Sequence, residues 1–231
     1  KREVVVRVNA LDTTWGYKDI ARAASSSADA ILLPKTESAN AVRQLEHIMV
    51  ESGAPDDMEI WCMVETLRGV LRAELIASAS SRVSCLVMGT SDLAKDLHAH
   101  HTRERIPMMM SLGQCILVAR AYGLSILDGV HLDLTDDEGF EQSCLQGKDF
   151  GFDGKTLIHP KTISKANETY GPSAEEVKWS NDIIAAFDAA RAKGEGVVVI
   201  DGKLVENLHI VEARRIVKMS GRINELEADI N

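Results

Sequence analysis

The 231-residue sequence lacks several features that would assign it to a specialised class of protein. It has no apolar run close to the roughly 20 residues that a membrane-spanning helix needs, so we do not expect a membrane protein. A net charge of -9, with no dense stripe of lysine and arginine, argues against a nucleic-acid-binding protein. A local basic pocket for a phosphorylated ligand is still compatible with that charge. No internal repeat or low-complexity segment is present.

Cysteines are few and widely spaced, and none of the four forms a CxxC pair. Cys62 and Cys85 lie inside apolar segments, where a thiol behaves as a small hydrophobic side chain. This usage indicates a reducing compartment, and we expect a cytoplasmic protein. The chain opens with Lys1-Arg-Glu, without an initiator methionine or a signal peptide. We therefore expect that the natural protein has a segment before residue 1.

Short apolar runs alternate with segments of helical periodicity up to about residue 160. Continuous apolar runs of this length are typical of parallel strands that are buried on both faces. Strands are predicted over Val4–Asn9, Ala30–Pro34, Glu59–Glu65, Val83–Gly89, Ile126–His131 and Lys155–His159. Helices are predicted over Thr36–Ser52, Leu67–Ala79, Met108–Tyr122 and Asp137–Phe150.

These six β/α units predict a (β/α)8 TIM barrel over residues 1–170, with one or two further units before residue 1. A doubly wound open sheet is the alternative, but no glycine-rich phosphate turn follows an early strand. Residues 171–231 are predicted to form a helix–hairpin–helix extension. Ser173 and Glu176 would cap its first helix, Asp201-Gly202 would turn its hairpin, and its last helix would run from about Leu208 to Glu227.

Two acidic residues close successive predicted strands and lie 27 positions apart. Glu65 ends one strand, and Asp92 follows the next. The carboxyl ends of parallel strands surround the mouth where ligands bind in such folds. Two carboxylates at that edge can share one hard divalent cation, although a helix-cap or salt-bridge role is the alternative for each acid alone.

Six motifs occur in one order along the chain, and together they resemble a known family. They are Val6-Arg-Val-Asn-Ala-Leu-Asp12, Leu33-Pro-Lys-Thr36, Val64-Glu-Thr66, Met88-Gly-Thr-Ser-Asp-Leu93, Gly151-Phe-Asp-Gly-Lys-Thr-Leu-Ile-His-Pro160 and Asp201-Gly-Lys-Leu-Val-Glu206. This order resembles the citrate lyase β-subunit-like branch of the HpcH/HpaI aldolase family. Within it, the chain is most similar to CoA-ester lyases for malyl-CoA, β-methylmalyl-CoA or citramalyl-CoA. The family's early Asp-Leu-Glu-Asp motif is absent from this sequence.

The resemblance implies a Mg²⁺-dependent lyase, with Mn²⁺ as an alternative ion. Such an enzyme cleaves a 3-hydroxyacyl-CoA reversibly into an acyl-CoA and a 2-oxo acid such as glyoxylate or pyruvate. A malyl-CoA thioesterase or malate-synthase-like enzyme is one alternative. A citrate lyase β-subunit that acts only with an acyl-carrier partner is another. We expect a homo-trimer or homo-hexamer that binds small molecules and neither nucleic acid nor membranes.

The resemblance also implies which residues bind metal and transfer protons. Glu65 and Asp92 match the family's metal ligands, and Arg7 matches an arginine at the thioester or enolate oxygen. Arg7 lies between two valines, and a buried unpaired guanidinium is costly, so a ligand role is favoured over an edge salt bridge. Glu206 matches an acid–base aspartate that would act in cis or on a neighbouring subunit, with a solvated hairpin carboxylate as the alternative. Lys35 is either an active-site cation or a cap on the mouth of the barrel.

The remaining matches concern substrate binding. Gly89, Thr90 and Ser91 match the turn whose backbone N–H groups hold the substrate carboxylate. Ile158 and Pro160 match the segment beside the pantetheine arm and adenine of CoA. The His98–Arg105 segment is predicted to be a solvated loop at the mouth, with Arg103 or Arg105 meeting CoA phosphates.

Overall fold

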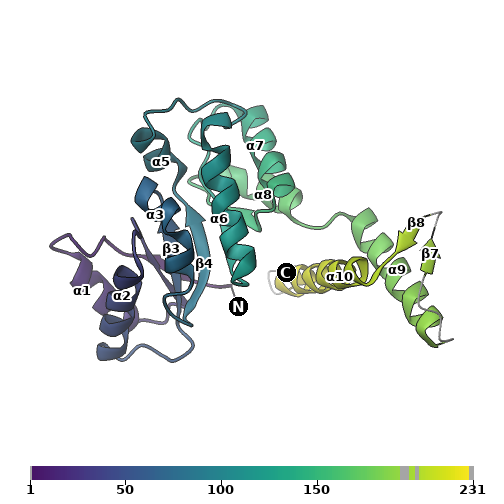
Figure 1. Ribbon diagram of the computed structural model, residues 1–231, viewed down its shortest axis with the longest axis horizontal. Coiled ribbons are helices and arrows are strands. Elements are labelled where there is room, and N and C mark those ends of the chain that lie inside the picture. The colour runs from purple at the N-terminus through teal and green to yellow at the C-terminus, as the bar shows by residue number, and fades with distance from the viewer. Residues whose placement is uncertain (1, 193–197, 201–202, 229–231) are drawn as a thin grey trace. The chain divides into compact units, whose positions relative to one another are not determined.

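The computed structural model describes residues 2–192, 198–200 and 203–228 (Figure 1). The chain divides into two compact units, one covering Glu3–Ala166 and another that begins at Asn167. The domain boundary expected after residue 170 stays a prediction, because a division by contacts does not show which segments fold independently.

Six parallel strands form the sheet of the first unit, and each pairs with the next strand along the chain. This sequential order is that of the wall of a TIM barrel, so the α/β prediction is confirmed as a partial barrel of six strands. The strand expected over Lys155–His159 is present but spans only Gly154–Lys155, because the chain turns away after Thr156 towards Pro160, which has no N–H to donate. The strands are β1 (Val5–Arg7), β2 (Ala30–Leu33), β3 (Glu59–Val64), β4 (Val83–Met88), β5 (Ser125–Asp128) and β6 (Gly154–Lys155).

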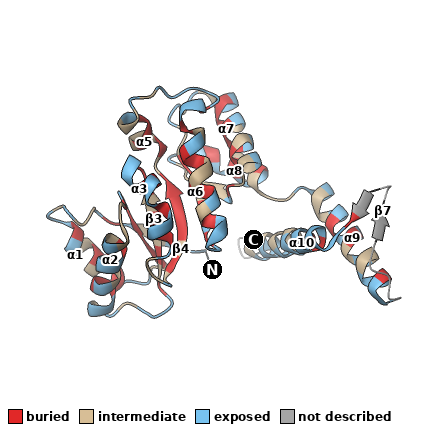
Figure 2. Ribbon diagram, in the orientation of Figure 1, coloured by how far each residue is buried: buried red, intermediate tan, exposed pale blue. Residues whose placement is uncertain are grey.

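Side chains alternate between the two faces of this sheet. Leu32, Cys85 and Val87 form a buried cluster on the inner face, with Trp61 and Met63 packed against it. The intervening residues, among them Ile31, Ile60 and Leu86, are fully buried on the face that the helices cover. Figure 2 shows β4 as a band of buried residues in the middle of the unit.

Helices follow the strands in the alternating order that the sequence predicts. The helix expected over Leu67–Ala79 is in fact two helices, because the chain departs from helical geometry at Arg72, whose N–H is shared between the carbonyls of Arg68 and Gly69. Neither α1 nor α5 was expected, and α5 places Asp92 in a helix. The elements are α1 (Gly16–Ala24), α2 (Ala39–Glu51), α3 (Leu67–Leu71), α4 (Ala73–Ala77), α5 (Thr90–Asp96), η1 (Ile106–Met108), α6 (Met109–Ala121), α7 (Asp137–Phe150), η2 (Pro160–Thr162) and α8 (Ile163–Tyr170).

The second unit contains α9 (Ala174–Ala192), β7 (Val198–Ile200), β8 (Lys203–Val205) and α10 (Asn207–Ala228). The capping pair before α9 is confirmed: the Ser173 N–H donates to Glu176 Oε2 at 2.7 Å, and the Glu176 N–H donates to Ser173 Oγ at 3.1 Å. β7 and β8 pair antiparallel as expected, and the turn predicted at Asp201-Gly202 lies outside the described residues. Ile183, Val205, Ile210 and Ala213 form the small core of this unit.

The cysteines are unpaired, in agreement with the sequence prediction. Cys62, Cys85, Cys115 and Cys144 are all buried free thiols. Burial raises the pKa of Cys62 to about 12. Such thiols are unreactive, so none of them is a candidate nucleophile. In the part of the chain that the structure describes, no helix is long and apolar enough to cross a membrane.

Candidate functional site

Glu65 directly follows β3 and is only 7% exposed. It continues the inner-face row of Trp61 and Met63, because alternate residues of a strand share a face. The backbone N–H of Lys35 donates a 2.8 Å hydrogen bond to Glu65 Oε1. Burial raises the pKa of the Glu65 carboxyl, the Lys35 N–H lowers it, and the Asp92 charge raises it again. Burial is the largest of these effects, so the surroundings of Glu65 favour its neutral form more than water does.

Asp92 lies in the first turn of α5 and is half-buried. Because α5 begins directly after β4, it brings Asp92 to the same edge of the sheet as Glu65. The two carboxyl groups interact, since Asp92 acts on the pKa of Glu65 both as a charge and as a hydrogen-bond partner. The structure thus brings the two predicted metal ligands together, while metal binding itself stays a prediction.

A metal ion at this edge would have few protein ligands. Among the described residues, no three His, Cys, Asp or Glu side chains are grouped so that they could hold a metal. Mg²⁺ is often bound by only one or two carboxylates and keeps several waters. The Glu65–Asp92 pair is therefore a candidate site in which waters or substrate oxygens complete the shell.

Gly89, between β4 and α5, allows the two carboxylates to approach. A Cβ atom on Gly89 would collide with Glu65 Cβ and would lie 2.6 Å from Glu65 Oε2. The Gly89 N–H also donates to the Val64 carbonyl at 3.0 Å, which joins the ends of β3 and β4. Any side chain at position 89 would displace Glu65. A glycine is therefore needed at this position to leave space for the Glu65 side chain.

Thr90 and Ser91 open α5 beside the carboxylate pair. Thr90 is 4% exposed and lines a cleft of about 650 Å³. Ser91 Oγ is buried and has no hydrogen-bond partner among the described residues. Gly89 gives α5 no side-chain cap, and the first N–H groups of a helix have no acceptor within it. Several donors at this position thus remain available to a bound anion.

Arg7 is the last residue of β1 and is exposed here, whereas its valine neighbours suggested burial. In this chain β1 pairs with β2 alone, and the sequence predicts a further β/α unit before it. Val5 packs against the inner-face cluster, so Arg7 belongs to the same inner row. With the described residues, the Arg7 guanidinium makes no hydrogen bond or ion pair. It lines a cleft of about 370 Å³, and its predicted ligand role stays a prediction.

A second strand-end acid, Asp128 of β5, was missed by the sequence analysis. Asp128 is fully buried, and both of its oxygens accept from Arg105 Nη1 at 2.7 Å. Lys155 Nζ donates to Asp128 Oδ2 at 2.7 Å, and the Gly129 N–H donates to Oδ1 at 2.8 Å. Burial lowers the pKa of Lys155, while Asp128 raises it. Arg105 is therefore used within the fold, which corrects its predicted contact with CoA. An acid that ends an apolar strand, as Glu65 does, was the available signal.

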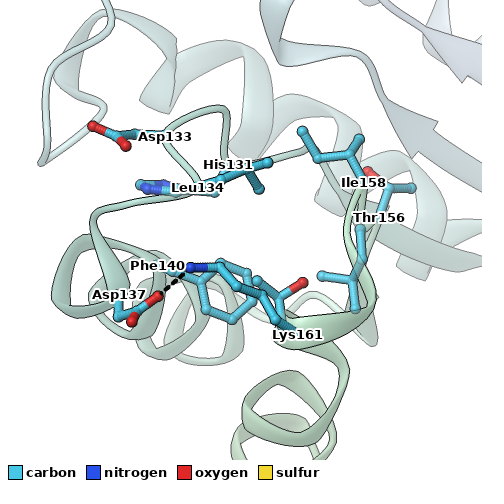
Figure 3. Close-up of a pocket in the computed structure, with 10 residues that line it drawn as sticks. His131, Asp133, Leu134, Asp137, Phe140, Thr156, Ile158 and Lys161 are labelled. Atoms are coloured by element: carbon cyan, nitrogen blue, oxygen red, sulfur yellow. Dashed lines mark hydrogen bonds and ion pairs between the residues drawn. The ribbon is translucent and has the colours of Figure 1, made fainter.

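A small pocket lies between the segments that follow β5 and β6 (Figure 3). Ile158 lines one side, and His131 lines the other. The ion pair between Lys161 Nζ and Asp137 Oδ1, at 2.8 Å, closes a further side. Pro160 begins η2 next to this pocket and is exposed. Ile158 and Pro160 thus lie on open surface at the strand ends, and their contact with CoA stays a prediction.

Glu206 lies in the second unit, between β8 and α10, and is exposed. Its backbone N–H donates to His209 Nδ1 at 2.9 Å, and its carbonyl accepts the His209 N–H at 3.0 Å. These two bonds cap α10, so the Glu206 carboxylate is not used as the cap. It has no hydrogen bond or ion pair with the described residues. Its acid–base role, in cis or in trans, stays a prediction.

Comparison with known proteins identifies the family of this chain. Residues 1–160 match the HpcH/HpaI aldolase/citrate lyase family. A (3S)-malyl-CoA thioesterase of Cereibacter sphaeroides (strain ATCC 17025 / ATH 2.4.3) is 46% identical over 215 residues, which are 93% of this chain and 73% of that protein. The citrate lyase subunit beta of Escherichia coli (strain K12) is 32% identical over 219 residues, which are 93% of this chain and 72% of that protein.

A solved structure is similar as well. Protein CitE from Mycobacterium tuberculosis, in complex with magnesium, acetoacetate and coenzyme A, is 29% identical with a TM-score of 0.73. The match covers 94% of this chain and 78% of that one. The chain therefore belongs to the HpcH/HpaI aldolase/citrate lyase family.

Proposed function

We propose that this chain is a Mg²⁺-dependent enzyme that hydrolyses the CoA thioester of a 3-hydroxy diacid, with malyl-CoA as the first candidate. The observation that carries the proposal is the Glu65–Asp92 carboxylate pair at the ends of adjacent strands. The 46% identity to a (3S)-malyl-CoA thioesterase supports hydrolysis, which the sequence analysis held as an alternative to carbon–carbon cleavage. The citrate lyase relatives keep the lyase reaction as the second candidate.

The residues present fit a hard divalent cation. Glu65 is buried beside a second carboxyl, and burial together with Asp92 raises its pKa, so a bound cation would favour the ionised form of Glu65. Oxygen ligands and two carboxylates suit Mg²⁺, and Mn²⁺ accepts the same set. When bound, the ion would polarise a carbonyl or carboxylate oxygen of the substrate. The complex of protein CitE with magnesium supports this choice.

Hydrolysis of malyl-CoA breaks the C–S bond, consumes one water and gives malate and CoA. In our proposal, Glu206 takes a proton from the water while the water oxygen adds to the thioester carbon. Glu206 then gives the proton to the departing thiolate of CoA. Arg7 stabilises the negative charge that develops on the thioester oxygen. The α5 N–H groups and Ser91 hold the free carboxylate of the acyl group. Ile158 and Pro160 lie along the pantetheine arm.

The products of the reaction distinguish the three candidate functions. Purified protein is incubated with malyl-, β-methylmalyl- or citramalyl-CoA, with Mg²⁺ or with EDTA. A thiol reagent detects free CoA, and phenylhydrazine detects the 2-oxo acid. Hydrolysis releases thiol without 2-oxo acid, whereas cleavage releases 2-oxo acid without thiol. A citrate lyase β-subunit that needs an acyl carrier releases neither.

Glu65→Gln is the matched control for the metal, because it preserves the shape of the side chain. We expect this variant and EDTA to abolish the activity equally. Activity on malyl-CoA that survives both treatments would refute the proposed metal site.

A homo-trimer or homo-hexamer in the cytoplasm completes the proposal. Leu71, Leu75, Met110 and Leu117 on α3, α4 and α6 are between 57% and 82% exposed. Apolar surface of this kind is typical of an interface with another protein. The buried free thiols support a reducing compartment. Size-exclusion chromatography with light scattering tests the oligomer, and a monomeric mass at micromolar concentration would contradict it.

A further inference from the structure

Lys35 has a backbone conformation that its own side chain does not stabilise. Its φ is 47°, in the left-handed region where a Cβ atom crowds the following carbonyl oxygen. Glycine or asparagine adopts this conformation with less strain. The Lys35 side chain is exposed, and its ammonium has no hydrogen bond or ion pair with the described residues.

Two other described non-glycine residues have positive φ, and each has a structural explanation. His98 ends α5, and its N–H donates to the Lys95 carbonyl at 3.0 Å, as residues at the end of a helix commonly do. Arg105 is held by its buried guanidinium on Asp128. Lys35 neither ends a helix nor has a buried side chain. Lys35 instead lies in the tight turn that follows β2, and this turn places it beside the candidate ligand Glu65.

The strain at Lys35 is imposed by its neighbours on β3. The Lys35 N–H is directed at Glu65 Oε1, at 2.8 Å. The next residue, Thr36, is fully buried, and its N–H donates to the Met63 carbonyl at 3.0 Å. Thr36 Oγ1 donates back to the Leu33 carbonyl at 2.9 Å. The backbone on both sides of Lys35 is therefore fixed beside the candidate metal ligand.

The Lys35 ammonium lies close enough to act on this ligand without pairing with it. Its charge lowers the pKa of Glu65, yet no ion pair within 4.0 Å joins the two side chains. Lys35 follows β2 and Thr90 follows β4, and these are the two strands that flank β3. Lys35 and Thr90 therefore follow the two strands that lie next to the strand of Glu65.

We propose that Lys35 is a specificity-determining residue that binds the free carboxylate of the acyl group. This inference rests on the proposed function. The phosphates of CoA are separated from the thioester by the long pantetheine arm, so a cation beside the metal ligands meets the acyl end. There, the only anionic group of malyl-CoA is its carboxylate. The ammonium supplies the positive charge that complements this carboxylate.

Lys35→Gly tests the inference, because it keeps the N–H that binds Glu65 while it removes both the ammonium and the strain. The KM for malyl-CoA is compared with the inhibition constant of 3-hydroxybutyryl-CoA, in which a methyl group replaces the carboxylate. Loss of a hydrogen bond to a charged group predicts a rise of about 10–100-fold in the KM. The inhibition constant should stay within about twofold, and the melting temperature should stay unchanged or rise.

His98→Gly is the matched control, since it relieves similar strain at an exposed residue outside the proposed site. It should leave both constants unchanged. An unaltered KM in Lys35→Gly would overturn the inference. An equal loss of affinity for both CoA esters would overturn it too, as would a rise in KM that is accompanied by a lower melting temperature. Wild-type protein that is inactive on malyl-CoA would refute the proposed function and the inference together. Active wild type with a fully active Lys35→Gly variant would refute the inference alone.

Discussion

Neutralising Asp128 should destabilise the first unit strongly, because this carboxylate balances two buried cations. The exposed fractions of the Asp128 and Lys155 side chains are 0% and 1%, and that of Arg105 is 10%. Removing one partner of a buried ion pair costs roughly 3–5 kcal/mol, since the remaining charge stays buried without a counterion. For a chain of this length, 1 kcal/mol shifts the melting temperature by about 2–4 °C. We therefore expect Asp128→Asn to lower it by about 6–20 °C, measured by circular dichroism.

The exposed pair of Lys178 and Asp182 provides the control for this experiment. Its nitrogen–oxygen distance is also 2.7 Å, but its side chains are 79% and 51% exposed. Pairs of this kind contribute about 0.3–0.5 kcal/mol, so Asp182→Asn should shift the melting temperature by about 2 °C or less. Adding Lys155→Met to Asp128→Asn removes one of the uncompensated cations and should recover part of the loss. An Asp128→Asn protein as stable as the Asp182→Asn control would refute the reasoning.

Three further predictions concern the candidate site. Gly89→Ala places a methyl group on Glu65, and a displacement of this size should lower kcat/KM for malyl-CoA about 10²-fold, with a weaker response in a Mg²⁺ titration. Burial raises the pKa of Glu65, so the folded chain binds the carboxyl proton of Glu65 more tightly than the unfolded chain does. The stability gained from this proton is present at low pH and is lost as the pH rises through the raised pKa. Without metal, the melting temperature of Glu65→Gln should therefore be higher than that of wild type at neutral pH and equal to it at low pH. Mg²⁺ should raise the melting temperature of wild type alone. A lower melting temperature of the variant at neutral pH would contradict this. Glu206→Gln should lose about 10²–10⁴-fold in kcat with little change in KM. Mixing it with Arg7→Ala should restore activity only if Glu206 acts on a neighbouring subunit; a fully active Glu206→Gln variant would exclude the acid–base role.

The sequence predicted the ends of β3 and β4 to within one residue, because period and composition are local properties, whereas the strands expected to end at His131 and His159 end at Asp128 and Lys155. Glu65 and Asp92 could be found from the two apolar runs that they follow. The Asp128 cluster was not found, because the predicted strand continued past Asp128 to His131 and because Arg105 belongs to no periodic segment. Local patterns thus identify the ligands at strand ends, whereas partners that meet only in three dimensions escape them.

The energetics of Glu65 connect the fold to its proposed chemistry. β2 contributes one N–H at Lys35, and β4 contributes the glycine that leaves space for the side chain. Neither contribution compensates a buried negative charge beside Asp92, because the pKa of Glu65 is still raised. A group that binds the folded state alone stabilises it in proportion to its affinity, and a divalent cation also relieves the repulsion between the two carboxylates. We therefore expect a bound divalent cation to stabilise this pair of carboxylates, as the proposed function requires.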